Sequence, residues 1–202
     1  MQSVENKIIK RISGKGRGAA YASKDFLDLG NRTAVDQALS RLAVKEVLRR
    51  LKPGVYDYPR INDKLGGELS PVMEEVAKAI ARKNNFRILI SGALAVNQLG
   101  LSTQVPAKIV FLTDGRERKV KILNQSLIFR HASPRNMAIC GKKSEMILQA
   151  LRYLGKRGVD DDVIGKLSKM LSSKDKKHLK KDIRYAPAWV GGVVDKIIGA
   201  YE

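Results

Sequence analysis

Cysteine, histidine and aromatic residues are all scarce in this chain of 202 residues. Cys140 is the only cysteine, which excludes an internal disulfide and a zinc cluster built from cysteines. Only two histidines accompany it, so we expect no metal and no cofactor, and Cys140 is expected to be a buried structural thiol. Aromatic residues make up 5% of the chain, and no strand carries the paired aromatics on which RNA-binding sheets stack bases.

Long apolar runs are also missing. No hydrophobic segment reaches the ~18 to 20 residues that a membrane-spanning helix needs, and the first dozen residues mix charged with apolar side chains. Hydrophobic residues make up 44% and charged residues 29%, close to the averages of globular proteins. We therefore expect a folded cytoplasmic protein that does not associate with membranes.

Acidic residues are heavily outnumbered by basic ones. The chain has 39 Lys and Arg against 20 Asp and Glu, a formal net charge of +19. Solubility alone is served by a net charge of magnitude ~2 to 8 in a small domain. The excess indicates a polyanionic partner, with nucleic acid as the first candidate.

Three helices and a hairpin are expected in residues 1–62. Ser3 caps a first helix that ends near Gly14, and Ser23 caps a second that stops at Gly30. Asn31 caps a third helix, in which apolar side chains recur at helical spacing: Val35, Ala38, Leu39 and Leu42. The order and length match a winged helix-turn-helix DNA-binding domain.

The expected hairpin joins residues 47–52 to residues 55–58 through Pro53-Gly54. Because a turn with L-proline fits a two-residue hairpin poorly, we expect its loop to be longer than two residues. This hairpin would be the wing.

Polar and basic side chains of these segments are the expected contacts to double-stranded DNA. The third helix would place its polar face in the major groove, where arginine recognises guanine and glutamine recognises adenine. The hairpin and a glycine-rich basic loop would contact phosphates. The expected DNA-binding residues are Lys15, Arg17, Arg32, Thr33, Gln37, Ser40, Arg41, Arg49, Arg50 and Lys52.

A linker over residues 63–69 is expected to separate this domain from a second one over residues 70–202. The second domain is predicted as α/β, a small sheet with helices that ends in a helical segment, so the overall class is α+β. Strands are expected at 86–90, 108–112, 118–123 and 126–131, and helices at 70–83, 93–99, 143–154, 161–171, 174–184 and 188–200. Trp189 is expected to anchor the last helix on the core.

The strand before Ser91-Gly92, with the helix and strand that follow, resembles the opening of the nucleotidyltransferase fold. That fold holds Mg²⁺ with two carboxylates on the next strand, but residues 108–112 read Lys-Ile-Val-Phe-Leu without an acid. We therefore expect a degenerate, noncatalytic version and no enzyme. Asp114 is interpreted as a turn former, and Asp160-Asp161-Asp162 as the N-terminal cap of a helix.

Five segments carry a resemblance to a known family. They are Gly18-Ala19-Ala20-Tyr21, the stretch from Lys24 to Gly30, Gly54-Val55-Tyr56-Asp57-Tyr58-Pro59, the stretch from Ile90 to Ala95, and Tyr185-Ala186-Pro187-Ala188-Trp189. Together they resemble the abortive-infection (AbiEi-like) antitoxins of bacterial type IV toxin–antitoxin systems. These systems act in phage defence.

The resemblance implies a transcription regulator with two roles. The N-terminal winged helix-turn-helix would bind inverted repeats in its own operator and repress the operon, and the C-terminal antitoxin domain would counteract a cognate nucleotidyltransferase-like toxin. The family has no single catalytic residue to carry over. A second interpretation of the net charge remains open, an RNA-binding or ribosome-associated basic protein without catalytic activity.

Overall fold

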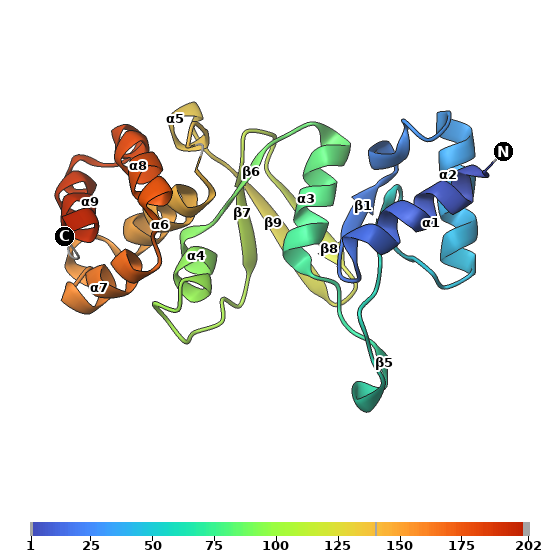
Figure 1. The fold of residues 1–202 in the computed structure, drawn as a ribbon, viewed down its shortest axis with the longest axis horizontal. Coiled ribbons are helices and arrows are strands. Elements are labelled where there is room, and N and C mark those ends of the chain that lie inside the picture. Colours follow the sequence, from blue (N-terminus) through green and yellow to red (C-terminus); the bar gives the residue numbers. More distant parts are fainter. Residues whose placement is uncertain (1, 140, 200–202) are drawn as a thin grey trace. The chain divides into compact units, whose positions relative to one another are not determined.

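The computed structural model describes residues 2–139 and 141–199 as a mixed α and β chain with small sheets and a helical C-terminal segment (Figure 1). This confirms the expected α+β class at that level. The chain forms two compact units, one of residues 1–87 with 120–127 and the other of residues 88–119 with 128–202. Cys140 lies outside the described residues.

The first unit begins with helix α1 (Val4–Lys15), strand β1 (Ala20–Ala22), the 3-10 helix η1 (Ser23–Phe26) and helix α2 (Arg32–Val44). Two of the three expected caps are present: the Ser3 side chain accepts from the backbone N–H of Asn6, and Asn31 accepts from Ala34. The expected cap at Ser23 is wrong, because Ser23 lies inside η1, whose N-cap position is Ala22. The second expected helix is only the single 3-10 turn η1. The Asp25 carboxylate accepts the N–H of Ala22 and so closes this turn tightly where a longer helix was expected.

Strands β2 (Arg49–Lys52) and β3 (Val55–Asp57) form the expected hairpin, and β1 joins it in the antiparallel order β1-β3-β2. The expectation of a longer loop is wrong. Lys52 pairs with Val55, so only Pro53 and Gly54 connect the strands. The register shifts between Arg50 and Lys52, and such a bulge adds the local twist that lets this turn close the strands. Gly54 takes the positive φ of 66° that the second turn position requires.

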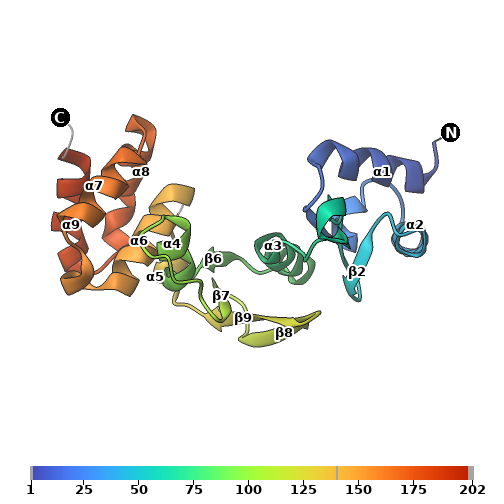
Figure 2. The same cartoon turned by 90° about the horizontal axis from the view of Figure 1, so that it is seen from below.

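The core of the first unit lies where α1, α2 and the small sheet meet. Figure 2 shows α2 beside β2. The apolar face of α2 that the sequence predicts is buried in this core. The main buried side chains are Ile8, Ile12, Tyr21, Phe26, Val35, Leu39, Leu42, Leu48 and Tyr56.

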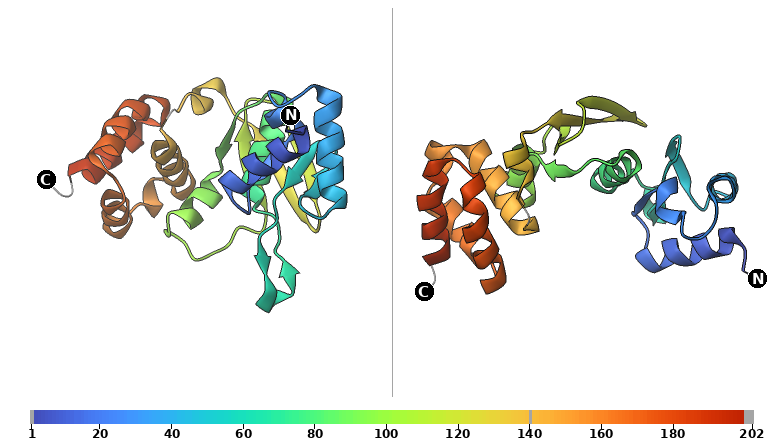
Figure 3. Two further views of the ribbon diagram at one scale, coloured as in Figure 1. Left: turned by 45° about the vertical axis from the view of Figure 1, so that its right-hand side comes forward. Right: turned by 90° about the horizontal axis from the view of Figure 1, so that it is seen from above.

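The segment expected to be a linker has structure of its own. Strands β4 (Ile61–Asn62) and β5 (Gly67–Glu68) pair antiparallel around the 3-10 turn η2 (Asp63–Leu65), and this teal hairpin projects from the first unit in Figure 3. The unit boundary also differs from the expected one, because the first unit runs on to Arg87.

Helix α3 (Met73–Asn84), expected in the second domain, therefore belongs to the first unit, where it packs against β1, β3 and η1. Arg82 on α3 holds the Asp25 carboxylate through both oxygens at 2.8 to 3.0 Å and also donates to the Ala20 carbonyl at 2.9 Å. These contacts fasten α3 to β1 and η1.

The second unit contains β6 (Ile88–Ile90), α4 (Gly92–Gln98) and β7 (Ile109–Thr113). Strands β8 (Arg118–Ile122) and β9 (Gln125–His131) follow, and their residues 120–127 are counted with the first unit. The sheet has the order β6-β7-β9-β8, and β6 pairs antiparallel with β7. The short helix α5 (Pro134–Met137) comes after the last strand.

The chain then continues as the helices coloured orange to red in Figure 3, which are α6 (Lys142–Leu154), α7 (Asp161–Lys169), α8 (Ser173–Asp182) and α9 (Ala188–Gly199). The 3-10 turns η3 (Lys156–Gly158) and η4 (Ile183–Tyr185) lie between them. The sequence predicts these four helices to within a few residues. Asp160 accepts the N–H of Val163 at 2.9 Å, which confirms its capping role, and Trp189 packs against the core as expected.

No helix of the described residues is long and apolar enough to cross a membrane.

Candidate nucleic-acid interface

A cleft of about 600 Å³ opens on the first unit between α2 and the β2–β3 hairpin. Helix α2, the hairpin and the last turn of α3 all contribute to its wall. The lining residues are Arg32, Thr33, Asp36, Gln37, Ser40, Arg50, Pro53, Gly54, Tyr56 and Lys83. Eight of these ten residues are polar or charged, and three of them are cations.

The contribution of α2 follows from helical periodicity. Residues 32, 33, 36, 37 and 40 share one side of the helix, opposite the buried Val35, Leu39 and Leu42. The apolar stripe fixes the helix on the core, and this leaves Thr33, Gln37 and Ser40 exposed toward solvent. The cleft therefore presents hydrogen-bonding side chains on a rigid support.

One acid lies in this wall. The Arg32 Nε donates to the Asp36 carboxylate at 2.7 Å, an ion pair one helical turn apart. Partial burial favours the protonated form of Asp36, but the hydrogen bond from Arg32, the nearby Ser23 hydroxyl and the charges of Arg32 and Arg50 outweigh it and hold the pKa of Asp36 below its ordinary value. Asp36 is therefore an anion at neutral pH, and it orients the Arg32 guanidinium.

The hairpin adds Arg50 to the cleft. Arg50 is exposed on β2 and is paired in register with Tyr56 of β3, which is buried. Burial raises the pKa of the Tyr56 phenol, so it stays neutral beside the cation. Successive residues of a strand face opposite sides of a sheet, so Arg49 lies on the other face.

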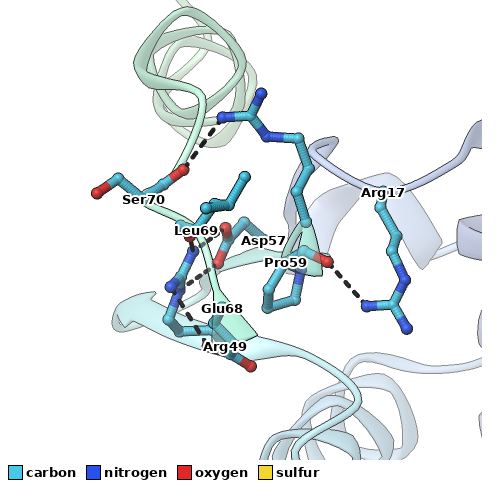
Figure 4. A network of polar contacts seen from close by, with 8 residues as sticks. Arg17, Arg49, Asp57, Pro59, Glu68, Leu69 and Ser70 are labelled. Carbon is cyan, nitrogen blue, oxygen red and sulfur yellow. Dashed lines mark hydrogen bonds and ion pairs between the residues drawn. The ribbon is translucent and has the colours of Figure 1, made fainter. Parts of the chain in front are cut away.

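Arg49 is engaged in a network of its own, shown in Figure 4. Its guanidinium donates to both oxygens of Asp57 at 2.7 and 3.1 Å, to Glu68 at 3.3 Å and to the Leu69 carbonyl at 3.0 Å. Asp57 is only 1% exposed, and its hydrogen bond raises the pKa of Arg49. Arg49 therefore joins β2 to β3 and to the β4–β5 hairpin.

The cations of the glycine-rich loop also have partners within the unit. Arg17 donates to the Pro59 carbonyl at 2.8 Å (Figure 4), and its guanidinium lies 4.6 Å from the centre of the Tyr58 ring. The Lys15 ammonium lies 5.3 Å from the centre of the Tyr21 ring. Neither residue lines the cleft. Arg41 and Lys52 are exposed, and they too are outside its wall.

Residues 7–179 match a protein family described as a family of unknown function, DUF6088. The chain belongs to this family. The match covers every residue that lines the cleft and extends well into the second unit. A comparison with curated proteins finds no match.

In this DUF6088 member, the structure gathers half of the residues expected to contact DNA: Arg32, Thr33, Gln37, Ser40 and Arg50. It adds Lys83, which the sequence reasoning missed because α3 was placed in the other domain. The Lys83 ammonium donates to the Pro53 carbonyl at 2.6 Å and so holds the tip of the hairpin. No local pattern in residues 73–84 points to this contact, which joins residues 30 positions apart.

Among the described residues, no group of three or more His, Cys, Asp or Glu is placed to hold a metal ion. Strand β7 carries no acid between Ile109 and Thr113, and Asp114 follows it at a bend of the chain.

Proposed function

We propose that the protein is a transcriptional repressor that binds duplex DNA through the cleft between α2 and the β2–β3 hairpin. In this proposal the first unit is a winged helix-turn-helix, with α2 as the recognition helix and the hairpin as the wing. The observation that carries it is the cleft itself, where hydrogen-bonding side chains of one helix face lie beside the cations Arg50 and Lys83. The element order α1, β1, η1, α2, β2, β3 and the sheet order β1-β3-β2 support it.

The chemistry of the wall suits the major groove. Gln37 offers the donor and acceptor pair that matches adenine, and Arg32, oriented by Asp36, offers the donor fork that matches guanine. Arg50 and Lys83 carry no base information and would lie against phosphates. A cleft with these two kinds of group side by side supports both sequence recognition and salt-dependent binding.

Duplex DNA fits this wall better than RNA does. The major groove of A-form RNA is too deep and narrow for side chains of a helix to reach base edges. Recognition of single-stranded RNA relies on exposed aromatic side chains, and the single aromatic residue of the wall, Tyr56, is buried. The RNA-binding alternative rests on the net charge alone.

The antitoxin role is the wider part of the proposal and depends on the resemblance of the five segments to AbiEi-like antitoxins. The second unit would be a degenerate nucleotidyltransferase-like domain that counteracts a cognate toxin of that fold in the cytoplasm. The acid-free strand β7 supports a noncatalytic role. Co-expression with the product of the adjacent reading frame, the proposed toxin, tests this role. Cells in which that product alone inhibits growth should grow again when this protein is co-expressed. Growth that stays inhibited would rule out this part of the proposal.

Binding to the upstream region of the protein's own gene tests DNA recognition. Fluorescence anisotropy should give tighter binding to that duplex than to random DNA or double-stranded RNA of equal length, with affinity falling steeply as salt rises. Gln37→Ala should weaken the operator complex roughly five- to 150-fold while barely changing random DNA, because it removes a base contact worth ~1 to 3 kcal/mol.

Arg41→Ala is the matched control on the same helix. Arg41 is exposed but outside the cleft, so its loss should reduce operator and random DNA affinity alike and only slightly. Equal losses on both duplexes for Gln37→Ala would show that α2 does not recognise base pairs. Equal affinity for RNA and DNA would favour the RNA-binding alternative.

A further inference from the structure

The second unit contains a cavity of about 300 Å³ that the proposed DNA-binding function does not use. It lies where the start of α4, the sheet and helix α6 meet. The lining residues are Ser91, Gly92, Ala93, Val110, Leu112, Arg130, Gln149, Arg152 and Tyr153. Its volume is at the small end of the range for ligand sites.

Three polar atoms in this lining have no hydrogen-bond partner among the residues that the structure describes. They are Ser91 Oγ, Gln149 Nε2 and one terminal nitrogen of Arg152. Ser91 is only 9% exposed and Gln149 only 4%. A buried donor without a partner costs roughly 1 to 3 kcal/mol, and native proteins rarely leave one unsatisfied. Three such atoms from two elements around one cavity indicate a missing acceptor.

Positive charge accompanies these donors. Arg152 donates through its other terminal nitrogen to the Tyr185 carbonyl at 2.5 Å, and among the described residues neither Arg152 nor Arg130 forms an ion pair. Burial lowers the pKa of Arg152, and the charge of Arg135 lowers it further. The cavity thus holds a half-buried guanidinium that forms no ion pair with a carboxylate of the described residues.

Close packing of α4 on α6 brings these groups together. A Cβ on Gly92 would lie 2.5 Å from the Tyr153 Cβ and 2.7 Å from the Gln149 carbonyl oxygen, so only glycine fits there. This contact sets Ser91 beside Gln149. The Ser91 hydroxyl does not cap α4, so it remains available to a ligand. The acid one turn earlier on α6, Glu145, accepts the Ile90 N–H and is outside the cavity lining.

We propose that this cavity binds the phosphoryl group of a small organic phosphate, held by Arg130, Arg152, Ser91 and Gln149. Phosphate oxygens are acceptors and match an arginine fork and neutral donors. The apolar remainder of the wall, Ala93, Val110, Leu112 and the ring of Tyr153, provides a surface for the organic part of the molecule. This site is independent of the proposed DNA-binding function.

Titration of the full-length protein with AMP, inorganic phosphate and adenosine tests the site. Calorimetry gives the affinities, and ¹H–¹⁵N NMR follows the backbone N–H of Ser91 and the side-chain amide of Gln149. AMP and phosphate should both bind with one-site stoichiometry and shift these signals, whereas adenosine alone should bind far more weakly. If AMP binds more tightly than phosphate and Tyr153→Ala removes this gain in affinity, the bound phosphoryl group belongs to a nucleotide. If the two affinities are equal, the ligand is free phosphate.

Two variants separate this site from general attraction of anions to a basic protein. Arg130→Ala should weaken phosphate binding about tenfold, because it removes a charged hydrogen-bond donor. Arg157→Ala removes the same charge from an exposed position on η3, outside the cavity, and should leave binding unchanged.

Gln149→Glu places a negative charge in the cavity and should abolish binding. Arg130 is exposed, so its variant keeps the test valid even if Gln149→Glu fails to fold. The proposal is overturned if phosphate shifts no signal at Ser91 or Gln149, which would mean that the cavity holds water only. Equal losses in Arg130→Ala and Arg157→Ala would overturn it as well.

Discussion

The two faces of strand β2 each carry one arginine, and the two side chains have different surroundings. Arg49 is held by a buried carboxylate, a second acid and a backbone carbonyl, whereas its neighbour Arg50 opens into the cleft beside α2. In the sequence the two residues are an indistinguishable basic pair. Net charge indicates a polyanionic partner. The comparison shows that the acids packed beside each cation determine which cations are available to bind that partner.

The largest difference between the two arginines should be in stability. Arg49→Ala leaves the Asp57 carboxylate buried without its cation, and breaking such a pair costs about 3 kcal/mol or more. Thermal unfolding followed by circular dichroism should show a drop in Tm of roughly 12 °C or more for a unit of this size. Arg50→Ala, the matched control, should change the free energy of unfolding by no more than ~0.5 kcal/mol. Similar Tm values for both variants would mean that the Arg49 network is not structural.

In DNA binding, Arg50→Ala should have the larger effect and Arg49→Ala the smaller one. Arg50→Ala should weaken operator and random DNA alike and reduce the slope of log affinity against log salt by ~0.9, the value for one lost phosphate contact. Salt titrations by fluorescence anisotropy measure the slope. Arg49→Ala, measured below its Tm, should leave it unchanged. An unaltered slope in Arg50→Ala would place the wing away from the DNA backbone.

Lys83 extends the comparison to a cation that has a partner and still lines the cleft. Its ammonium bonds a neutral carbonyl, which leaves its charge uncompensated. Lys83→Ala should therefore reduce the salt slope by up to ~0.9, as Arg50→Ala does. Lys45→Ala is the control, because Lys45 forms its ion pair with Glu5 and does not line the cleft. A slope reduced equally by both variants would mean that the cleft is not the surface that contacts DNA.

The smallest expected effect concerns the acid in the cleft. The folded pKa of Asp36 lies below its value of ~3.9 in an unfolded chain, so its ion pair with Arg32 stabilises the fold above that pH. The contribution is lost as pH falls through the folded pKa. For an exposed pair one helical turn apart it amounts to ~0.3 to 0.5 kcal/mol. Asp36→Asn should reduce the loss of unfolding free energy below about pH 4 by that amount, which thermal unfolding as a function of pH measures. A steeper loss of stability in Asp36→Asn than in the unmodified protein would contradict the stabilising role of the Asp36–Arg32 ion pair.

Local patterns predicted much of the fold. The caps at Ser3, Asn31 and Asp160 follow from side chains that act within three residues, and the helices of the second unit follow from apolar periodicity. The polar face of α2 could also be predicted from the sequence, because the same periodicity that buries Leu39 exposes Gln37.

Features that depend on strand register or on residues distant in the sequence were missed or misjudged. The loop between β2 and β3 closes in two residues because of a bulge that no turn rule for Pro53-Gly54 includes. Lys83 reaches the cleft only because α3 packs on the first unit. The cavity of the second unit needs Ser91, Arg130 and Gln149 from three elements, and nothing in the sequence spacing brings them together.

The attachment of α3 to β1 and η1 bears on how the protein is made. The first unit cannot be completed when its hairpin leaves the ribosome, because Arg82, the partner of Asp25, is synthesised later. Until then the backs of β1 and β3 lack the helix that packs on them. A fragment that stops at Asp63 should therefore be aggregation-prone, and the shortest fragment that can mature independently must include α3.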